Sequence, residues 1–120
     1  MIKVVVSGAH GKMGQETCRA VLDDKDLALV GVFDPGHTGE DLVFADDVFK
    51  TSGDLKKLIE ESKPDVLVDF STPAVVLENI KLALSLGVHA VVGTTGVSKD
   101  DFQKAYEDAS DGKAHLFVAP

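Results

Sequence analysis

Short runs of apolar residues alternate along this chain with segments whose apolar residues recur at helical spacing. The runs of strand length are Ile2–Val6, Leu27–Phe33, Asp65–Phe70, Val88–Val92 and Ala114–Val118. Each is almost continuously apolar, which is typical of strands buried on both faces of a parallel sheet.

Four segments between these runs carry an apolar stripe and the start or stop signals of helices. The first is Gln15–Leu22, and the second begins at 52–54 and stops at Lys63-Pro64. The third starts at Pro73 and is capped by Gly87, and the fourth takes Ser98 as its N-cap. Five strands alternating with four helices predict an α/β fold, a doubly wound, Rossmann-like parallel sheet that forms a single domain over residues 1–120.

The stretch from Pro35 to Gly53 is the least regular part of the chain. It opens rich in glycine and acidic residues and then holds two short apolar pieces, Leu42–Ala45 and Val48–Phe49. We predict a long loop here, with room for one short edge strand.

Composition and charge narrow the class of protein. The chain has 120 residues, 44% hydrophobic and 27% charged, which is ordinary for a globular domain. A net charge of −8 argues against nucleic acid as a partner, and no apolar run approaches the roughly 18 residues of a membrane span. The chain runs from Met1 straight into a strand with no secretory signal, and its single cysteine, Cys18, predicts a buried thiol. We therefore expect a cytoplasmic protein with no membrane partner.

Three glycines follow the first strand, in the segment S-G-A-H-G-K-M-G that ends at Gly14. A strand, a glycine turn and a helix together favour a phosphate-binding crevice, where backbone N–H groups at the helix start face an anion. Gly8 would permit the sharp turn, Gly11 the close approach of a pyrophosphate, and Gly14 the packing of helix on strand. The spacing G-x-x-G-x-x-G differs from the commoner G-x-G-x-x-G, and any tight strand-to-helix turn can use glycine.

Asp34 lies 20 residues after Gly14, at the end of the second predicted strand. Dinucleotide-binding folds place there an acid that accepts hydrogen bonds from the adenosine ribose. A carboxylate at this point repels a 2′-phosphate and so favours NAD over NADP, although Lys12 could reach such a phosphate from the other side. The alternative is a turn-initiating aspartate before Pro35-Gly36.

The chemically suggestive residues all fall at the carboxyl ends of the predicted strands, where doubly wound sheets bind ligands. They are Gly8–Met13, Asp34, Phe70–Thr72, Gly93–Gly96 and Ala119-Pro120. This convergence favours a site over coincidence.

The four histidines, by contrast, show no catalytic or metal-binding spacing. His10 lies in the glycine turn, His37 in an acidic loop, and His89 and His115 near the starts of strands. We expect each to be a surface or strand-edge residue, predict no metal, and assign no catalytic residue within this chain.

Four motifs taken together resemble dihydrodipicolinate reductase, which reduces a cyclic imine or enamine dicarboxylate with NADH or NADPH in lysine biosynthesis. They are G-A-H-G-K-M-G (8–14), D-F-S-T-P (69–73), V-V-G-T-T-G (91–96) and F-V-A-P (117–120). The glycine turn occurs in many dehydrogenases, but the pairing of the second and third motifs is specific to this family. The resemblance runs over the whole chain.

The resemblance implies a role for each matching position, with Lys12 near the adenosine phosphate and Asp34 on the adenosine ribose. Gly8, Ala9, His10, Gly11, Lys12 and Met13 would hold the pyrophosphate. Phe70 and Thr72, with Ser71 between them, would line the middle of the cofactor. Gly93, Thr94 and Thr95 would contact the nicotinamide and its ribose, Ala119 and Pro120 would begin the segment beneath it, and Thr95 would help to seat the substrate.

Two departures from the family qualify this expectation. The family often has arginine at position 12 and sometimes a basic residue just after Asp34, whereas this chain has Lys12 and Pro35. NADH is therefore the favoured cofactor and NADPH a possible one. Family members are also about twice as long. We expect the chain to be the cofactor domain alone, without the second domain that holds the substrate pocket and builds a homotetramer.

Two other functions fit part of the pattern. The CoA-binding half of an acyl-CoA ligase also uses a glycine turn and a later threonine–glycine loop, although Asp34 suits a dinucleotide better. A non-catalytic nucleotide sensor would need no second domain.

Overall fold

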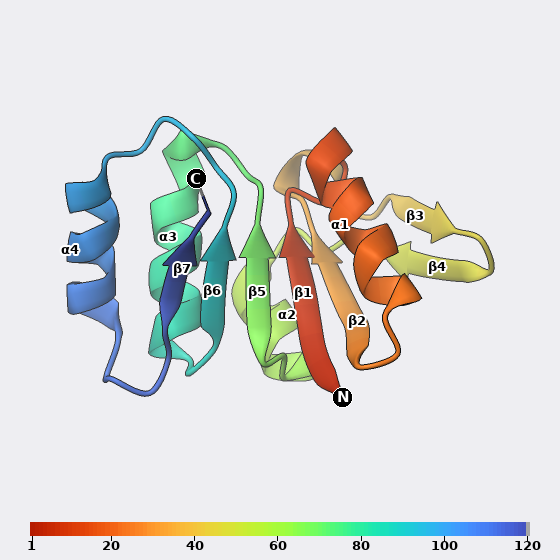
Figure 1. Ribbon diagram of the computed structural model, residues 1–120. Coiled ribbons are helices and arrows are strands. Elements are labelled where there is room, and N and C mark those ends of the chain that lie inside the picture. The colour runs from red at the N-terminus through yellow and green to blue at the C-terminus, as the bar shows by residue number, and fades with distance from the viewer. Residues whose placement is uncertain (120) are drawn as a thin grey trace.

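The computed structural model, which describes residues 1–119, contains a five-stranded parallel sheet (Figure 1). The strand order is β2-β1-β5-β6-β7. Its strands are β1 (Ile2–Ser7), β2 (Leu27–Phe33), β5 (Val66–Asp69), β6 (His89–Val92) and β7 (Leu116–Val118). Every pairing is parallel, so the predicted doubly wound α/β fold is confirmed.

Within the described residues, four α-helices cover the two faces of the sheet unequally. On one face α1 (Lys12–Asp23) lies over β1 and β2, while α2 (Leu55–Ser62), α3 (Pro73–Ser85) and α4 (Lys99–Ala109) pack on the other (Figure 1). Phe117 of β7, at one edge of the sheet, is 63% exposed. Within residues 1–119, the helices are all too short or too polar to cross a bilayer.

The irregular segment after β2 differs from the prediction. A short 3₁₀ helix, η1 (Pro35–His37), leads into an antiparallel hairpin of β3 (Asp41–Phe44) and β4 (Asp47–Lys50). The expected loop with one edge strand was therefore wrong. The signal was weak because only Leu42 and Phe44 of the hairpin are fully buried, with Phe49 partly buried beside them. The turn also uses Ala45 at φ 53°, where glycine would be the usual residue.

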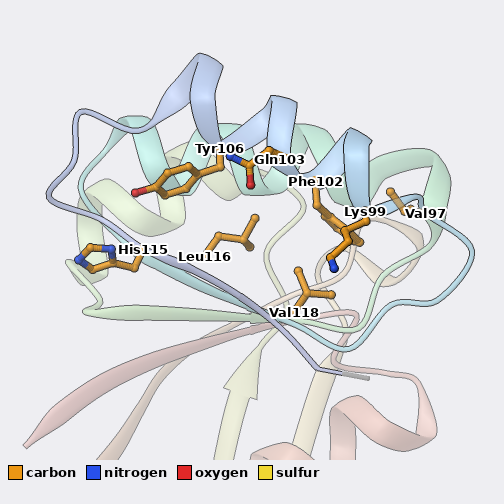
Figure 2. A pocket seen from close by; sticks show the side chains of 8 residues that line it. All are labelled: Val97, Lys99, Phe102, Gln103, Tyr106, His115, Leu116 and Val118. Atoms are coloured by element: carbon orange, nitrogen blue, oxygen red, sulfur yellow. The ribbon is translucent and has the colours of Figure 1, made fainter.

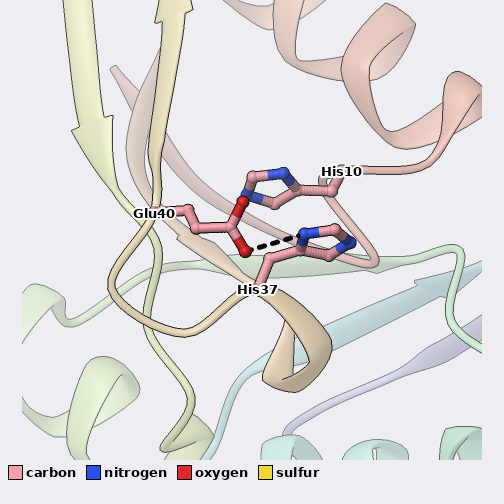
Figure 3. Close-up of side chains that lie close together, drawn as sticks. All are labelled: His10, His37 and Glu40. Atoms are coloured by element: carbon pink, nitrogen blue, oxygen red, sulfur yellow. Dashed lines mark hydrogen bonds and ion pairs between the residues drawn. The ribbon is translucent and has the colours of Figure 1, made fainter.

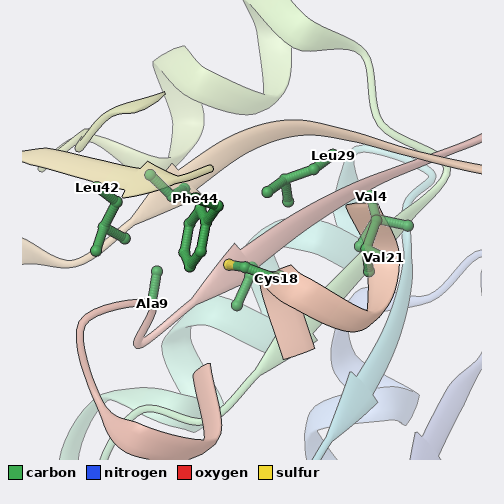
Figure 4. Packing of buried hydrophobic residues seen from close by; sticks show 9 residues of the cluster. Val4, Ala9, Cys18, Val21, Leu29, Leu42 and Phe44 are labelled. Carbon is green, nitrogen blue, oxygen red and sulfur yellow. The ribbon is translucent and has the colours of Figure 1, made fainter. Parts of the chain in front are cut away.

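The hairpin completes the core on the α1 face (Figure 4). Leu42 and Phe44 pack with Val4, Leu29 and Cys18, all of them buried. Burial raises the pKa of the Cys18 thiol to about 11, against a smaller lowering by the neighbouring Arg19 guanidinium. The thiol is therefore a neutral packing group, as the sequence predicts.

Candidate functional site

A cavity of about 440 Å³ opens at the carboxyl ends of β1, β2 and β5. Its wall includes seven of the residues predicted to bind a cofactor: Gly8, His10, Gly11, Asp34, Phe70, Ser71 and Thr72. Three separate stretches of sequence thus meet in one crevice, in the size range of small-molecule sites.

Two of the three glycines are required by the backbone around them. Gly8 has φ +74°, and a Cβ there would lie 2.7 Å from the carbonyl carbon of Phe70. A Cβ on Gly14 would overlap the carbonyl oxygen of Gly8, so Gly14 lets α1 pack directly on the turn. Gly11 meets only an ordinary contact at 3.4 Å, and its close approach to a pyrophosphate stays a prediction.

The start of α1 faces this crevice with free backbone donors. The helix begins at Lys12, three residues before the predicted start at Gln15, because packing on the turn favours a helical Gly14 despite its low propensity. Its N-cap, Gly11, offers no side-chain oxygen, and the first turn has no acidic residue. The N–H groups and the positive end of the helix dipole are therefore available to an anion.

Asp34 directly follows β2 and lies beside this helix start. One of its carboxylate oxygens, Oδ2, accepts a hydrogen bond from the backbone N–H of His10 at 3.1 Å. Among the residues that the structure describes, its side chain has no other hydrogen-bond donor. Because Asp34 is only half-buried, Oδ1 can accept a hydrogen bond from a bound hydroxyl group.

A second carboxylate, Asp69, ends β5 on the other side of β1 and holds the next turn in place. It is fully buried, and its Oδ1 accepts from the Ser71 backbone N–H at 2.7 Å and from the Ser71 hydroxyl. Its Oδ2 accepts from Asn79 Nδ2 at 2.9 Å, and the same amide donates to Ser7 Oγ at 3.3 Å. This network fixes the turn that carries Phe70–Thr72.

The remaining predicted residues extend the same edge of the sheet. Gly93 packs against the Phe70 ring, where a Cβ would overlap it, and Thr94 Oγ1 donates to the Ser71 carbonyl at 3.0 Å. Thr95 is exposed, and Ala119 donates its backbone N–H to Val92 at 2.8 Å. These residues lie beside the cavity and do not line it. Pro120 falls outside the described residues.

Three residues of the glycine turn also lie off the cavity wall. The Ala9 side chain is fully buried in the α1-face core (Figure 4), so only its backbone could touch a ligand. Lys12 and Met13 are exposed on the first turn of α1.

The structure adds His37 to the site, together with Pro35, Gly36 and Val75. The imidazole of His37 stacks on that of His10, with ring centroids 4.2 Å apart and planes 7° from parallel (Figure 3). His89 and His115 form a second stacked pair at 5.5 Å. The sequence pattern placed these histidines at the surface or at strand edges but did not predict that they stack in two pairs. The available signal was that His10 and His37 follow adjacent strands at the same edge of the sheet.

A second cavity, of about 500 Å³, lies between α4 and β7 (Figure 2). Its wall is largely apolar, with Phe102, Tyr106 and Leu116 prominent, and holds none of the predicted site residues. Parallel sheets bind ligands at the carboxyl ends of their strands, so the crevice with Asp34 is the candidate site.

Known proteins resemble this chain over nearly its whole length. Residues 2–120 match the family model described as dihydrodipicolinate reductase, N-terminus. A 4-hydroxy-tetrahydrodipicolinate reductase of Desulfitobacterium hafniense is 40% identical over 124 residues, covering 99% of this chain and 46% of the relative. The corresponding protein of Listeria welshimeri is 39% identical over 123 residues, covering 99% and 47%.

A solved structure is similar over the whole chain. It is dipicolinate-bound dihydrodipicolinate reductase from Paenisporosarcina sp. TG-14, with a TM-score of 0.82 and 32% identity, covering 100% of this chain and 47% of that one. The chain spans about half the length of the curated relatives it matches.

Proposed function

The chain belongs to the dihydrodipicolinate reductase family, whose N-terminal region it matches, and on that premise we propose that its crevice binds a nicotinamide dinucleotide. The observation that carries the proposal is the free oxygen of Asp34, in one cavity with the uncapped start of α1. A pyrophosphate needs such a helix start, and an adenosine ribose needs such an acceptor.

The residues present fit this group. Gly8 and Gly14 permit the close packing of the turn against Phe70 and of α1 against the turn, which brings the helix start to the crevice. Asp34 would accept hydrogen bonds from the ribose hydroxyls, and the first-turn N–H groups of α1 would bind the pyrophosphate. Phe70, Ser71 and Thr72 would line the middle of the cofactor, with Gly93, Thr94, Thr95 and the 119–120 segment toward the nicotinamide.

NADH is the cofactor we expect this crevice to prefer. A carboxylate that accepts from a ribose 2′-hydroxyl also repels a phosphate on that oxygen. The next residue, Pro35, brings no positive charge to offset the repulsion. Lys12, exposed on the first turn of α1, offers a nearby cation that leaves NADPH as a possible second cofactor.

The reaction we propose for the whole enzyme is the one for which its relatives are named. The nicotinamide would deliver hydride to 4-hydroxy-tetrahydrodipicolinate or dihydrodipicolinate, giving tetrahydrodipicolinate for the biosynthesis of lysine and diaminopimelate. In this proposal, residues 1–120 hold and orient the cofactor while Thr95 helps to seat the cyclic dicarboxylate. The catalytic groups and the homotetramer contacts would come from the half of the relatives that this chain does not span. We assign no catalytic residue to the chain itself.

Calorimetric titration with NADH, NADPH and CoA tests the proposal. We expect NADH to bind best, and Asp34→Ala to weaken it by about 10-fold, the loss of one charge-assisted hydrogen bond. Asp46→Ala is the matched control, because it removes the same charge from the exposed hairpin turn and should leave NADH affinity unchanged. Binding of CoA with neither dinucleotide would show the proposal to be wrong, as would equal NADH affinity in Asp34→Ala.

A further inference from the structure

Three metal-ligating side chains meet at the Asp34 end of the crevice. They are His10 of the glycine turn, His37 of η1, and Glu40 just before β3, each offering a ligand atom within 4.8 Å of the other two. Figure 3 shows the stacked imidazoles with a nitrogen of each on the side of the Glu40 carboxylate, and His37 Nδ1 lies 3.0 Å from Glu40 Oε2.

Backbone hydrogen bonds hold these three residues in place. The His10 backbone N–H donates to Asp34, and the His10 carbonyl accepts from Gln15 Nε2 at 2.9 Å. The N–H of Glu40 donates to the His37 carbonyl at 3.0 Å, and its own carbonyl accepts from Thr51 at 2.8 Å. Thr51, which is buried, also has its hydroxyl 2.7 Å from His10 Nε2. The cluster is therefore built on an ordered frame.

We propose that His10, His37 and Glu40 bind a divalent transition-metal ion of the Zn²⁺ type. Two imidazoles and one carboxylate are a donor set that zinc takes with a further position open, whereas Mg²⁺ and Ca²⁺ prefer oxygen ligands alone. Zinc bonds of about 2.0–2.1 Å place two tetrahedral ligands roughly 3.4 Å apart, close to the His37–Glu40 separation. A rotation of the His10 side chain would bring its ring nitrogen to the same separation from the other two ligands.

Exposure and surroundings suit such a site. The side chains of His37 and Glu40 are 46% and 57% exposed, so an ion can enter from solvent. Cys18 does not compete for the ion, because its thiol is buried and its pKa is raised to about 11, which disfavours the thiolate that metals bind. Since His10 and His37 also line the crevice, a bound ion would face its occupant.

The other stacked pair provides an internal control. His89 Nδ1 accepts the backbone N–H of His115 at 3.0 Å, and no carboxylate joins these rings to form a metal-ligand group within residues 1–119. The two stacked pairs differ in the Glu40 carboxylate, which lies beside His10 and His37 alone. We therefore do not propose that a stacked histidine pair is sufficient to bind the metal ion.

Calorimetric titration with ZnCl₂, and the visible absorption of added Co²⁺, test the proposal without any dinucleotide present. We expect one equivalent of Zn²⁺ to bind the native chain, at least about 10-fold weaker binding to Glu40→Gln, and none to the double variant His37→Asn with Glu40→Gln. His115→Asn should bind as the native chain does.

The idea fails if the native chain binds no Zn²⁺, or if the double variant binds it with unchanged affinity. Both altered side chains are exposed, so the variants should melt at the native temperature in metal-free buffer, which separates a lost site from a lost fold. Because the readout is metal binding itself, this result is independent of the cofactor titration.

Discussion

Asp34 and Asp69 lie at the carboxyl ends of the two strands that flank β1: Asp69 is the last residue of β5, and Asp34 directly follows β2. Asp69 is fully buried, and its two carboxylate oxygens accept hydrogen bonds, one from Ser71 and the other from Asn79. Asp34 is half-buried and accepts one bond, from the His10 backbone. An aspartate at the end of an apolar strand can therefore either hold a turn in place or bind a ligand. The two roles differ in whether its carboxylate has an oxygen free to accept a further hydrogen bond.

The largest effect should come from Asp69→Ala. The substitution removes the nearer acceptor of the buried Asn79 amide and the acceptor of the part-buried Ser71 N–H, and an unsatisfied buried group costs about 1–3 kcal/mol. We expect the free energy of unfolding to fall by about 3 kcal/mol, as measured by urea denaturation. A loss well below 1 kcal/mol would show that Asp69 is not the structural member of the pair.

Asp34→Asn should instead change ligand preference. The amide keeps the size of the carboxylate but removes the charge that opposes a 2′-phosphate. We expect NADPH affinity to rise relative to NADH by about 5-fold in paired calorimetric titrations. An unchanged ratio would mean that Asp34 does not face the adenosine ribose.

Cys18 is as buried as Asp69, but its side chain lacks the hydrogen-bond donors that surround the Asp69 carboxylate. Its pKa is raised from 9.0 to about 11, so between these values the folded chain keeps a proton that the unfolded chain loses. Stability is then unaffected by Cys18 below pH 9 and falls as the pH rises toward 11. Denaturation of the native chain and Cys18→Ala across this range should show a steeper alkaline loss in the native chain. Parallel curves would contradict the shift.

The smallest effect should be that of Asp34→Ala on stability. Only one hydrogen bond, to a half-buried oxygen, is lost, and we expect the free energy of unfolding to stay within about 0.5 kcal/mol of the native value. Urea denaturation beside Asp69→Ala gives the direct contrast. A loss as large as that of Asp69→Ala would assign both aspartates the same structural role.

The elements that the sequence predicted best were those with a clear run of apolar residues or a clear capping residue. The five parallel strands follow from apolar runs of strand length, and the cap at Ser98 follows from its hydroxyl, which accepts the Asp101 N–H at 3.1 Å. The hairpin β3–β4 was missed because only two of its side chains are fully buried and its turn has no glycine.

The crevice was predictable in outline for a different reason. Topology alone brings the ends of β1, β2 and β5 together, so the sequence was enough to group the glycine turn, Asp34 and Phe70–Thr72 in one crevice. The stacking of His10 on His37, and the approach of Glu40, depend on how η1 folds back toward Thr51. No local sequence pattern predicts this path of the chain, so these contacts could be identified only from the structure.

The strand order also determines when the fold can form during synthesis. β1 lies inside the sheet, yet it leaves the ribosome first, and Asp65, whose side chain accepts the backbone N–H of Lys3, comes 62 residues later. At a translation rate of about 5–20 residues per second, that interval is roughly 3–12 s. β2 can pair with one side of β1 early, while the other side stays open as an edge that can join a neighbouring chain. The nascent chain is therefore most prone to aggregate before β5 emerges, and a pause in translation there would lengthen that exposure.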